Sequence, residues 1–290
     1  MRSLENKSPL AALCYFLAVI GIAMFMRDLV VATVSLFFAV VFYIVRNGAR
    51  NMKSHLYSLI FFILIIILNP FFYHNGATVL FMFGDNPMTL EALIYGVASA
   101  EMVVAVIYWF RSFSEIMTSD KLLSVFGAVS PKFSLMLSMV LRFIPLFNRQ
   151  SKNVRSAQRA LGMYKNDNVI DSVRVGARVF SGVSGWALEN GIITADSMAA
   201  RGYGTTRRTS FSLYRSKKAD LIFIAVVALT FTAAVVGLTQ GEAFRFYPEI
   251  VVPSGALSVS AYAVYAALCA ISSIFEIYEG AKWKYLTSKI

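Results

Sequence analysis

The chain has 290 residues, of which 58% are hydrophobic and 15% are charged, and its formal net charge at pH 7 is +11. Its mean hydropathy of +0.64 reflects far more apolar side chain than one soluble core can bury. This composition excludes a soluble globular protein and predicts a protein that crosses the membrane several times. The two cysteines, Cys14 and Cys269, both lie in apolar runs, so neither a disulfide framework nor a thiolate metal site is predicted.

The N-terminus combines Arg2 and Lys7 with an apolar run over residues 10–26, a pattern that resembles a secretory signal. No small-x-small cleavage site follows this run, and a second apolar run begins at Leu29. The sequence therefore predicts an uncleaved first transmembrane span with a cytoplasmic N-terminus.

Six apolar stretches are near the length needed to cross about 30 Å of hydrocarbon, which takes about 20 helical residues. They cover residues 10–26, 29–45, 56–73, 90–110, 221–238 and 256–277. The predicted fold is all-α and polytopic, with these six transmembrane helices and long amphipathic cytoplasmic helices between the fourth and the fifth. The predicted organisation is four spans in residues 1–111, the cytoplasmic helices in residues 112–218 and two spans in residues 219–290.

The distribution of lysine and arginine predicts the orientation of the chain. The loop between the second and third spans contains three basic residues, whereas residues 74–89 contain none. Residues 111–218 hold 17 of the 27 lysines and arginines, and residues 239–255 hold only Arg245. We therefore expect the long insert and both termini in the cytoplasm. The net positive charge is then a topology signal, and nucleic acid is not an expected partner.

The cytoplasmic insert has apolar residues at helical spacing, which predicts long helices along or under the membrane. Residues 133–143 include only three polar positions, so this part is expected to be buried on most sides. Pro131 suits the first turn of the helix, and Pro145 breaks or bends it. Beyond Pro145, one face is apolar and the other is a cationic stripe, which either is solvated or faces lipid headgroups or a partner. The stripe consists of Arg149, Lys152, Arg155 and Arg159.

A further helix is expected to end at a pair of glycines. Asn166 or Asp167 can cap its start, and it runs towards Gly202. Gly202 and Gly204 can take the positive φ that terminates a helix. Arg201 then lies in the last turn, where the carbonyl end of the helix dipole favours a cation. This electrostatic role alone would explain an arginine at position 201.

Two short motifs lie about forty residues apart in this part of the chain. With the multi-span pattern and the basic helical insert, they resemble the transmembrane T component of energy-coupling factor transporters. The motifs are Ala157-Gln158-Arg159-Ala160-Leu161-Gly162 and Ala200-Arg201-Gly202-Tyr203-Gly204, the second followed by Arg207-Arg208-Thr209. The resemblance covers nearly the entire chain, and the second motif is its specific part.

In that family, Ala-Arg-Gly-like motifs at the ends of two long coupling helices dock in grooves of two cytoplasmic ABC-type ATPase subunits. The resemblance therefore implies ATPase-coupling roles for Ala200, Arg201 and Gly202, and for Arg159, Ala160, Leu161 and Gly162. The second motif matches directly. In the first, the alignment that keeps Gln158 and Gly162 in place puts Leu161 where the family usually has arginine. This difference allows an asymmetric contact with the two ATPases.

The resemblance also implies uptake of a micronutrient, a vitamin or a metal ion, at the cell membrane. The substrate would bind to a separate membrane protein, the S component, for which the expected contacts are Met136, Met139, Val140 and Phe143. Partner subunits would hydrolyse ATP, so this chain is expected to catalyse nothing and to bind no cofactor or metal. The sequence has no G-x-x-x-x-G-K-[ST] motif, and its two histidines, His55 and His74, lie on opposite predicted sides of the membrane.

A self-contained secondary transporter or channel is the alternative function, because Glu101 lies inside the fourth predicted span. An intramembrane carboxylate is costly and is by default a functional candidate. Small residues precede Glu101 and permit close helix packing, so a buried structural hydrogen bond explains it equally well. An intramembrane enzyme is not favoured, because no catalytic set of residues is evident.

Overall fold

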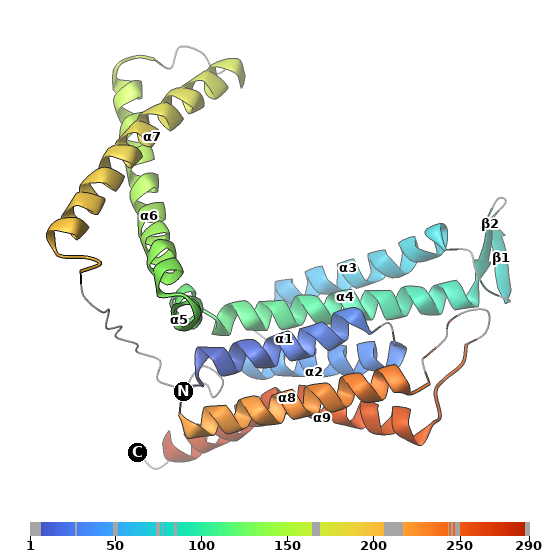
Figure 1. Cartoon of the computed structure of the whole chain (residues 1–290). Helices are drawn as coiled ribbons and strands as arrows, with labels where there is room; N and C mark the ends of the chain where they lie inside the picture. The colour runs from blue at the N-terminus through green and yellow to red at the C-terminus, as the bar shows by residue number, and fades with distance from the viewer. Residues whose placement is uncertain are drawn as a thin grey trace. The chain divides into compact units, whose positions relative to one another are not determined.

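The computed structural model describes residues 7–26, 28–48, 52–73, 76, 78–83, 86–163, 169–205, 217–242, 244, 246 and 250–287. Within these residues the chain forms nine helices and one short β-hairpin (Figure 1). It divides into two compact units, one made of Met1–Leu122 and Tyr214–Ile290 and the other of Leu123–Leu213. The predicted helix cap at Asn166 or Asp167 and the basic residues 207–209 lie outside the described residues.

The first unit contains the membrane-length helices. Its complete elements are α1 (Pro9–Phe25), α2 (Leu29–Asn47), α3 (Met52–Phe72), β1 (Val79–Phe83), β2 (Asn86–Thr89), α4 (Leu90–Ile116), α8 (Lys218–Gln240) and α9 (Ala256–Thr287). Among the described residues, α2, α3, α4, α8 and α9 are long and apolar enough to cross a membrane. The remaining apolar helix, α1, has 17 residues. At 1.5 Å per residue it spans about 26 Å, slightly less than a typical hydrocarbon core.

Aromatic side chains from α1, α2 and α4 meet at the centre of the first unit. Trp109 in α4 is fully buried. Its ring centroid lies 6.4, 6.2 and 5.9 Å from the centroids of Tyr15, Phe16 and Phe42. Trp109 Nε1 donates to Ser35 Oγ at 3.1 Å, so the buried indole keeps a hydrogen-bond partner. These contacts hold together helices that are far apart in the sequence.

Short polar side chains cap the starts of α1 and α2. Ser8 Oγ accepts from Ala11 N at 3.4 Å at the start of α1. Asp28 Oδ1 accepts from Val30 N at 3.2 Å at the start of α2. Both caps satisfy backbone donors that the first turn leaves without partners. The other carboxylate oxygen of Asp28 accepts from the Tyr262 hydroxyl at 2.6 Å, so the turn between α1 and α2 is also tied to α9.

The loop between the third and fourth spans contains a β-hairpin that the sequence analysis did not predict. β1 and β2 are antiparallel, with Val79 opposite Thr89 and Phe83 opposite Asn86. Glu91, in the first turn of α4, accepts a hydrogen bond from Thr78 N at 3.2 Å and a second one from the Thr78 hydroxyl. This carboxylate connects the hairpin to the start of α4.

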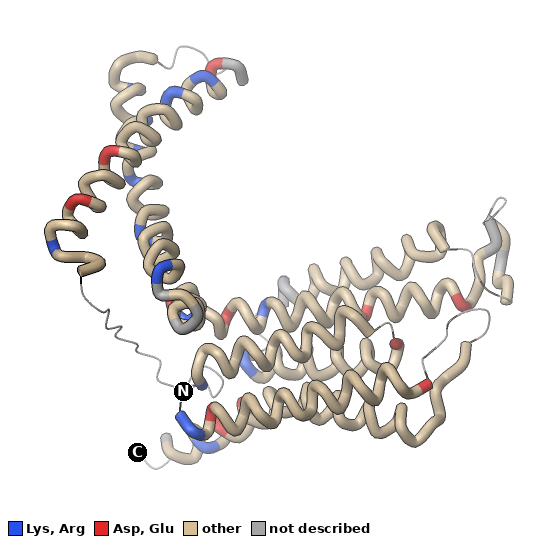
Figure 2. Tube along the Cα trace, viewed as in Figure 1, with Lys and Arg blue, Asp and Glu red and all other residues tan. Residues whose placement is uncertain are grey.

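The second unit consists of the end of α5 (Ser119–Val129) followed by α6 (Pro131–Ala160) and α7 (Val169–Ala200). Ser130 caps α6 and Pro131 occupies its first turn, as predicted. α6 continues through Pro145 to Ala160, so this proline does not end the helix. Figure 2 shows lysine and arginine spaced along α6 and near the start of α7, whereas the middle parts of the membrane helices carry few charges.

Candidate functional site

α6 ends in a cap that contains a glycine. Gly162 has a φ of 67°. Met163 N donates to Gln158 O at 3.1 Å, and Gly162 N donates to Arg159 O at 3.0 Å. These two bonds form a Schellman motif, which satisfies carbonyls that a helix end would otherwise leave without partners. Leu161 occupies the cap position, and 71% of its surface is exposed.

α7 ends in the same way. Gly202 has a φ of 75°. Tyr203 N donates to Met198 O at 3.0 Å, and Gly202 N donates to Ala199 O at 2.9 Å. Arg201 directly follows the last residue of the helix and is exposed. The predicted position of Arg201 at a helix end and the predicted positive φ of Gly202 are therefore confirmed.

The chain directly after Gly202 forms a tight turn. Thr205 donates to Gly202 O through its backbone N at 3.2 Å and through Oγ1 at 2.7 Å. Gly204 between them has a φ of 93°, which a residue with a Cβ rarely adopts. The backbone on both sides of Arg201 is therefore held in place, by α7 before it and by this turn after it.

The two caps are equivalent residue by residue. Both have one hydrogen bond that spans six residues and one that spans four, and both place glycine after the cap position. Arg159 lies inside the last turn of α6 and does not occupy the position that Arg201 has in the second cap. The equivalent pairs are Ala160 with Ala200, Leu161 with Arg201 and Gly162 with Gly202.

α6 and α7 cross near their midpoints (Figure 1). The rings of Phe147 and Trp186 meet edge to face with centroids 6.0 Å apart, and Phe147 also stacks on Phe143 at 5.6 Å. Val154 lies beside Gly182, where a Cβ would be 3.6 Å from the valine. The order of these contacts shows that the helices run antiparallel here. Each cap therefore lies about 20 Å of helix beyond the crossing, and the two caps are on opposite sides of it.

The surface of this crossed pair is both cationic and apolar. The predicted cationic stripe of α6 is exposed along its length, at Arg149, Lys152, Arg155 and Arg159. On α7, Arg174 Nη1 lies 3.8 Å from Asp171 Oδ1, and Arg178 is exposed. The stripe therefore lies on the surface of the second unit.

The expectation that residues 133–143 are buried on most sides is wrong for this chain by itself. α6 packs on α7 beyond this stretch, and Phe133 meets Phe126 of α5 with ring centroids 5.7 Å apart. Ser134 Oγ also donates to Leu123 O in α5 at 3.2 Å. Phe133, Met136 and Val140 are 45%, 56% and 46% exposed, and Met139 and Phe143 are half-buried.

α7 carries an exposed apolar surface that the sequence analysis did not single out. Val175 and Val179 on one side of the helix are buried. On the other side, four apolar residues lie within about 120° on a helical wheel. A helical wheel of α7, which is apolar on two opposite sides, would have revealed this surface. Its residues Val173, Phe180, Leu188 and Ile192 are 68%, 76%, 73% and 64% exposed.

Glu101, the residue behind the alternative function, makes a contact between two membrane helices. Its Oε2 accepts from Thr33 Oγ1 in α2 at 2.8 Å. The bond joins two helices, as the structural explanation of Glu101 expects, but Thr33 is exposed and the bond is not buried within this chain. Among the described residues, no group of three or more His, Cys, Asp or Glu side chains could hold a metal ion.

The membrane-length helices and the crossed pair of capped amphipathic helices define a multi-pass helical membrane protein with a separate helical unit. Residues 1–213 match the CbiQ family, described as cobalt transport proteins. Because this match covers well over half of the chain, the protein belongs to that family. It is also 26% identical over 183 residues to the energy-coupling factor transporter transmembrane protein EcfT 1 of Listeria monocytogenes serotype 1/2a (strain 08-5578). The aligned region covers 59% of this chain and 69% of that protein.

These relationships confirm the resemblance to the T component of energy-coupling factor transporters. The chain is a transmembrane, non-catalytic component of an uptake transporter. The region that matches the family includes both capped helix ends. A self-contained secondary transporter that depends on Glu101 is not supported. The family relationship indicates a component of a multi-subunit transporter, and the hydrogen bond to Thr33 gives Glu101 a role in helix packing.

Proposed function

We propose that this chain transmits ATP-driven motion from two cytoplasmic ABC-type ATPase subunits to a substrate-binding membrane S component. It thereby drives uptake of a vitamin or a metal ion. Residues 112–218 are the coupling region in this proposal, and residues 1–111 and 219–290 hold that region at the membrane. The observation that carries the proposal is the pair of equivalent Schellman caps at the ends of α6 and α7. Two equivalent helix ends suit docking to two similar subunits.

In the second motif, Arg201 is the main ATPase contact, with Ala200 and Gly202 beside it. Arg201 forms no ion pair within the part of the chain that the structure describes, so its charge is available to a partner. The small neighbours allow a partner surface to close around the guanidinium. Its planar fork of donors can satisfy carbonyl groups and a carboxylate together, which the point charge of lysine cannot do.

The first motif makes a different contact. Its residues are Arg159, Ala160, Leu161 and Gly162, and the exposed side chain at the cap position is apolar. Leu161 would be covered by an apolar part of the second ATPase, while Arg159 contributes charge from the preceding turn. The two ATPases are therefore bound through one polar and one apolar cap.

The S component is bound by the exposed apolar part of the same helices. Exposed apolar patches of this kind mark interaction surfaces. Met136 and Met139 have flexible side chains that suit interchangeable partners. Val140 and Phe143 extend the same surface of α6.

The protein lies in the cell membrane with its N- and C-termini in the cytoplasm. This orientation is supported by the lysine and arginine asymmetry of the loops. It puts both caps on the side where ATP is available. The partner subunits bind and hydrolyse the ATP, and this chain requires no cofactor of its own.

The test is replacement of Arg201 by glutamate and by lysine in cells that express the complete transporter. We expect Arg201→Glu to insert normally but to lose at least ~90% of ATP-driven uptake and to co-purify with less ATPase, since truncating a buried charge pair typically costs 2 kcal/mol or more. Arg201→Lys should retain partial activity. Arg178→Glu is the control, because it makes the same charge change at an exposed position of α7 away from the cap. Equal activity of Arg201→Glu and Arg178→Glu would contradict the proposal.

A further inference from the structure

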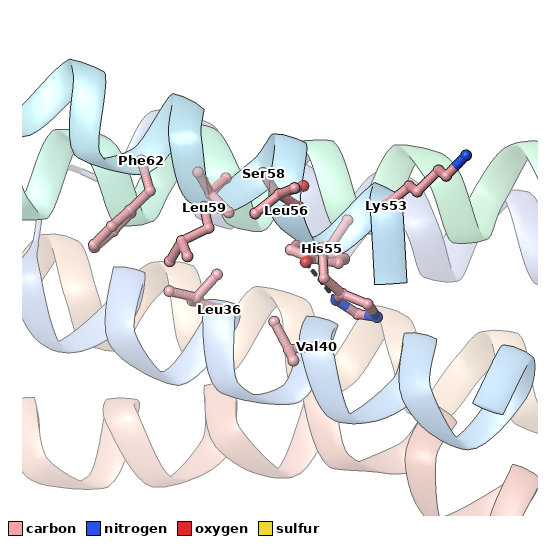
Figure 3. Close-up of a pocket in the computed structure, with 10 residues that line it drawn as sticks. Leu36, Val40, Lys53, His55, Leu56, Ser58, Leu59 and Phe62 are labelled. Atoms are coloured by element: carbon pink, nitrogen blue, oxygen red, sulfur yellow. Dashed lines mark hydrogen bonds between the residues drawn. The ribbon is translucent and has the colours of Figure 1, made fainter. Parts of the chain in front are cut away.

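A groove in the first unit lies between α2, α3 and α4. It has a volume of ≈ 520 Å³, within the range of pockets that hold small-molecule ligands. Its inner part is apolar, and Figure 3 shows Leu36 and Val40 of α2 facing Leu59 and Phe62 of α3 across it. The apolar walls lie among membrane-length helices, so a ligand that enters from the bilayer would meet them first.

One end of this groove is polar and basic. Lys53 and His55 line it at the start of α3, and Figure 3 shows Lys53 at this end. The His55 ring is held by a hydrogen bond of 2.8 Å between Nδ1 and the Tyr108 hydroxyl. Arg111 Nη1 donates to Ser58 Oγ, which also lines the groove, at 3.2 Å. Lys53 therefore places a cation at one end of an apolar groove.

A carboxylate of α4 is bonded to the end of α2. Glu115, one turn beyond Arg111 in α4, accepts from Arg46 Nε at 3.2 Å and from Asn47 Nδ2 at 2.7 Å. Lys53 itself is exposed. The basic end of the groove also coincides with the end of α2 at which the positive-inside rule places the cytoplasmic leaflet, the leaflet that carries anionic lipids.

We propose that this groove binds an anionic glycerophospholipid of the cytoplasmic leaflet. One acyl chain lies between Leu36 and Leu59, and the phosphate of the headgroup lies at the end marked by Lys53. The groove is apolar along its length and cationic at one end, which matches a lipid with apolar acyl chains and an anionic headgroup. A zwitterionic lipid offers the same chains without the net charge, so headgroup charge decides the selectivity.

The experiment is native mass spectrometry of the purified full chain with phosphatidylglycerol or phosphatidylcholine of identical acyl chains. Lys53→Ala should weaken phosphatidylglycerol binding about five-fold, the effect of one cation near an anionic headgroup. Leu59→Trp should weaken it at least ten-fold because the indole fills the groove. Leu64→Trp is the matched control, since Leu64 is similarly exposed on α3 but does not line the groove.

Three results would overturn the proposal. One is equal phosphatidylglycerol binding by Leu59→Trp and Leu64→Trp. The second is equal affinity of the wild-type chain for the two lipids. The third is a photo-crosslinker at position 59 that, in the assembled transporter, reacts with a partner protein and not with lipid. Crosslinking to lipid would support the proposal, provided that Lys53→Ala and Leu59→Trp also bind phosphatidylglycerol more weakly than the Leu64→Trp control does.

Discussion

The guanidinium of Arg46 lies between carboxylates from two other helices. Its Nε is 3.2 Å from Glu115 Oε2 in α4, and its Nη1 is 3.7 Å from Glu276 Oε1 in α9. The side chain of Arg46 is fully buried and that of Glu276 is only 6% exposed. This charged cluster therefore joins α2, α4 and α9 at one end of the first unit, where water screens the charges little.

We expect Glu276→Leu to destabilise the first unit by about 3 kcal/mol, because it leaves part of a buried positive charge uncompensated. The thermal unfolding midpoint of the purified full chain in detergent measures the effect. The double variant Arg46→Met, Glu276→Leu should be more stable than Glu276→Leu alone, since apolar residues often replace a buried ion pair without loss. An unchanged midpoint in Glu276→Leu would show that the Arg46 contact with α9 contributes little.

The glycine of the first cap offers a test of the backbone geometry. Gly162→Ala should destabilise the end of α6 by about 1–2 kcal/mol, because a Cβ is strained at positive φ. Among the described residues, no atom beyond the local backbone and chain neighbours lies within 4 Å of the added Cβ, so backbone strain is the expected cause. Gly162→Asn should be milder, since asparagine tolerates this conformation better.

The control for this pair is Gly176→Ala, an interior position of α7 with open space around the Cβ. There alanine should stabilise the helix by up to about 1 kcal/mol. Thermal unfolding of the full chain and ATPase co-purification are measured for all three variants. A stabilising effect of Gly162→Ala would be incompatible with a Schellman cap at this position.

The side chain at the first cap is expected to contact an apolar partner surface. Leu161→Asp should therefore weaken ATPase assembly, because it buries a carboxylate in an apolar contact. Leu161→Arg should be tolerated or mildly harmful, since it restores the residue found at the equivalent second cap. Ser156→Asp, an exposed position on the same helix, controls for added negative charge. Full assembly and activity of Leu161→Asp would mean that the first motif is not a contact.

The proposed topology predicts which positions react with an impermeant thiol reagent. In a chain without Cys14 and Cys269, cysteine at Asn75 or Glu242 should be labelled from outside. Cysteine at Asn168 should be labelled only after the membrane is permeabilised. Labelling of position 168 in intact cells would reverse the proposed arrangement.

The choice of Glu242 for this experiment follows from the structure. The neighbouring Gly241 is unsuitable, because an added Cβ would lie 2.6 Å from Ser258 Oγ and 2.7 Å from Gly237 O. Glu242 is exposed and is therefore expected to accept a cysteine without disturbing the contact between α8 and α9.

The sequence by itself determined the features that depend on neighbouring residues. Hydropathy over about 20 residues identifies a span because the length of apolar helix must match the bilayer. Glycine at positions 202 and 204 indicates a helix end because only local backbone conformation is involved. The β-hairpin was missed because its strands are short and Pro87 interrupts the second, a pattern that disfavours a strand assignment.

Only the tertiary structure decided which distant residues meet. The pairing of Trp109 with Ser35, the contacts of Arg46 with Glu276 and the crossing of Phe147 with Trp186 depend on how helices pack. The same holds for the exposure of Phe133 and Val140, which the apolar sequence around them suggested would be buried. Helical periodicity defines the apolar faces of each helix. Which helix covers each face depends on the crossing angle and register, and these arise from side-chain packing between helices.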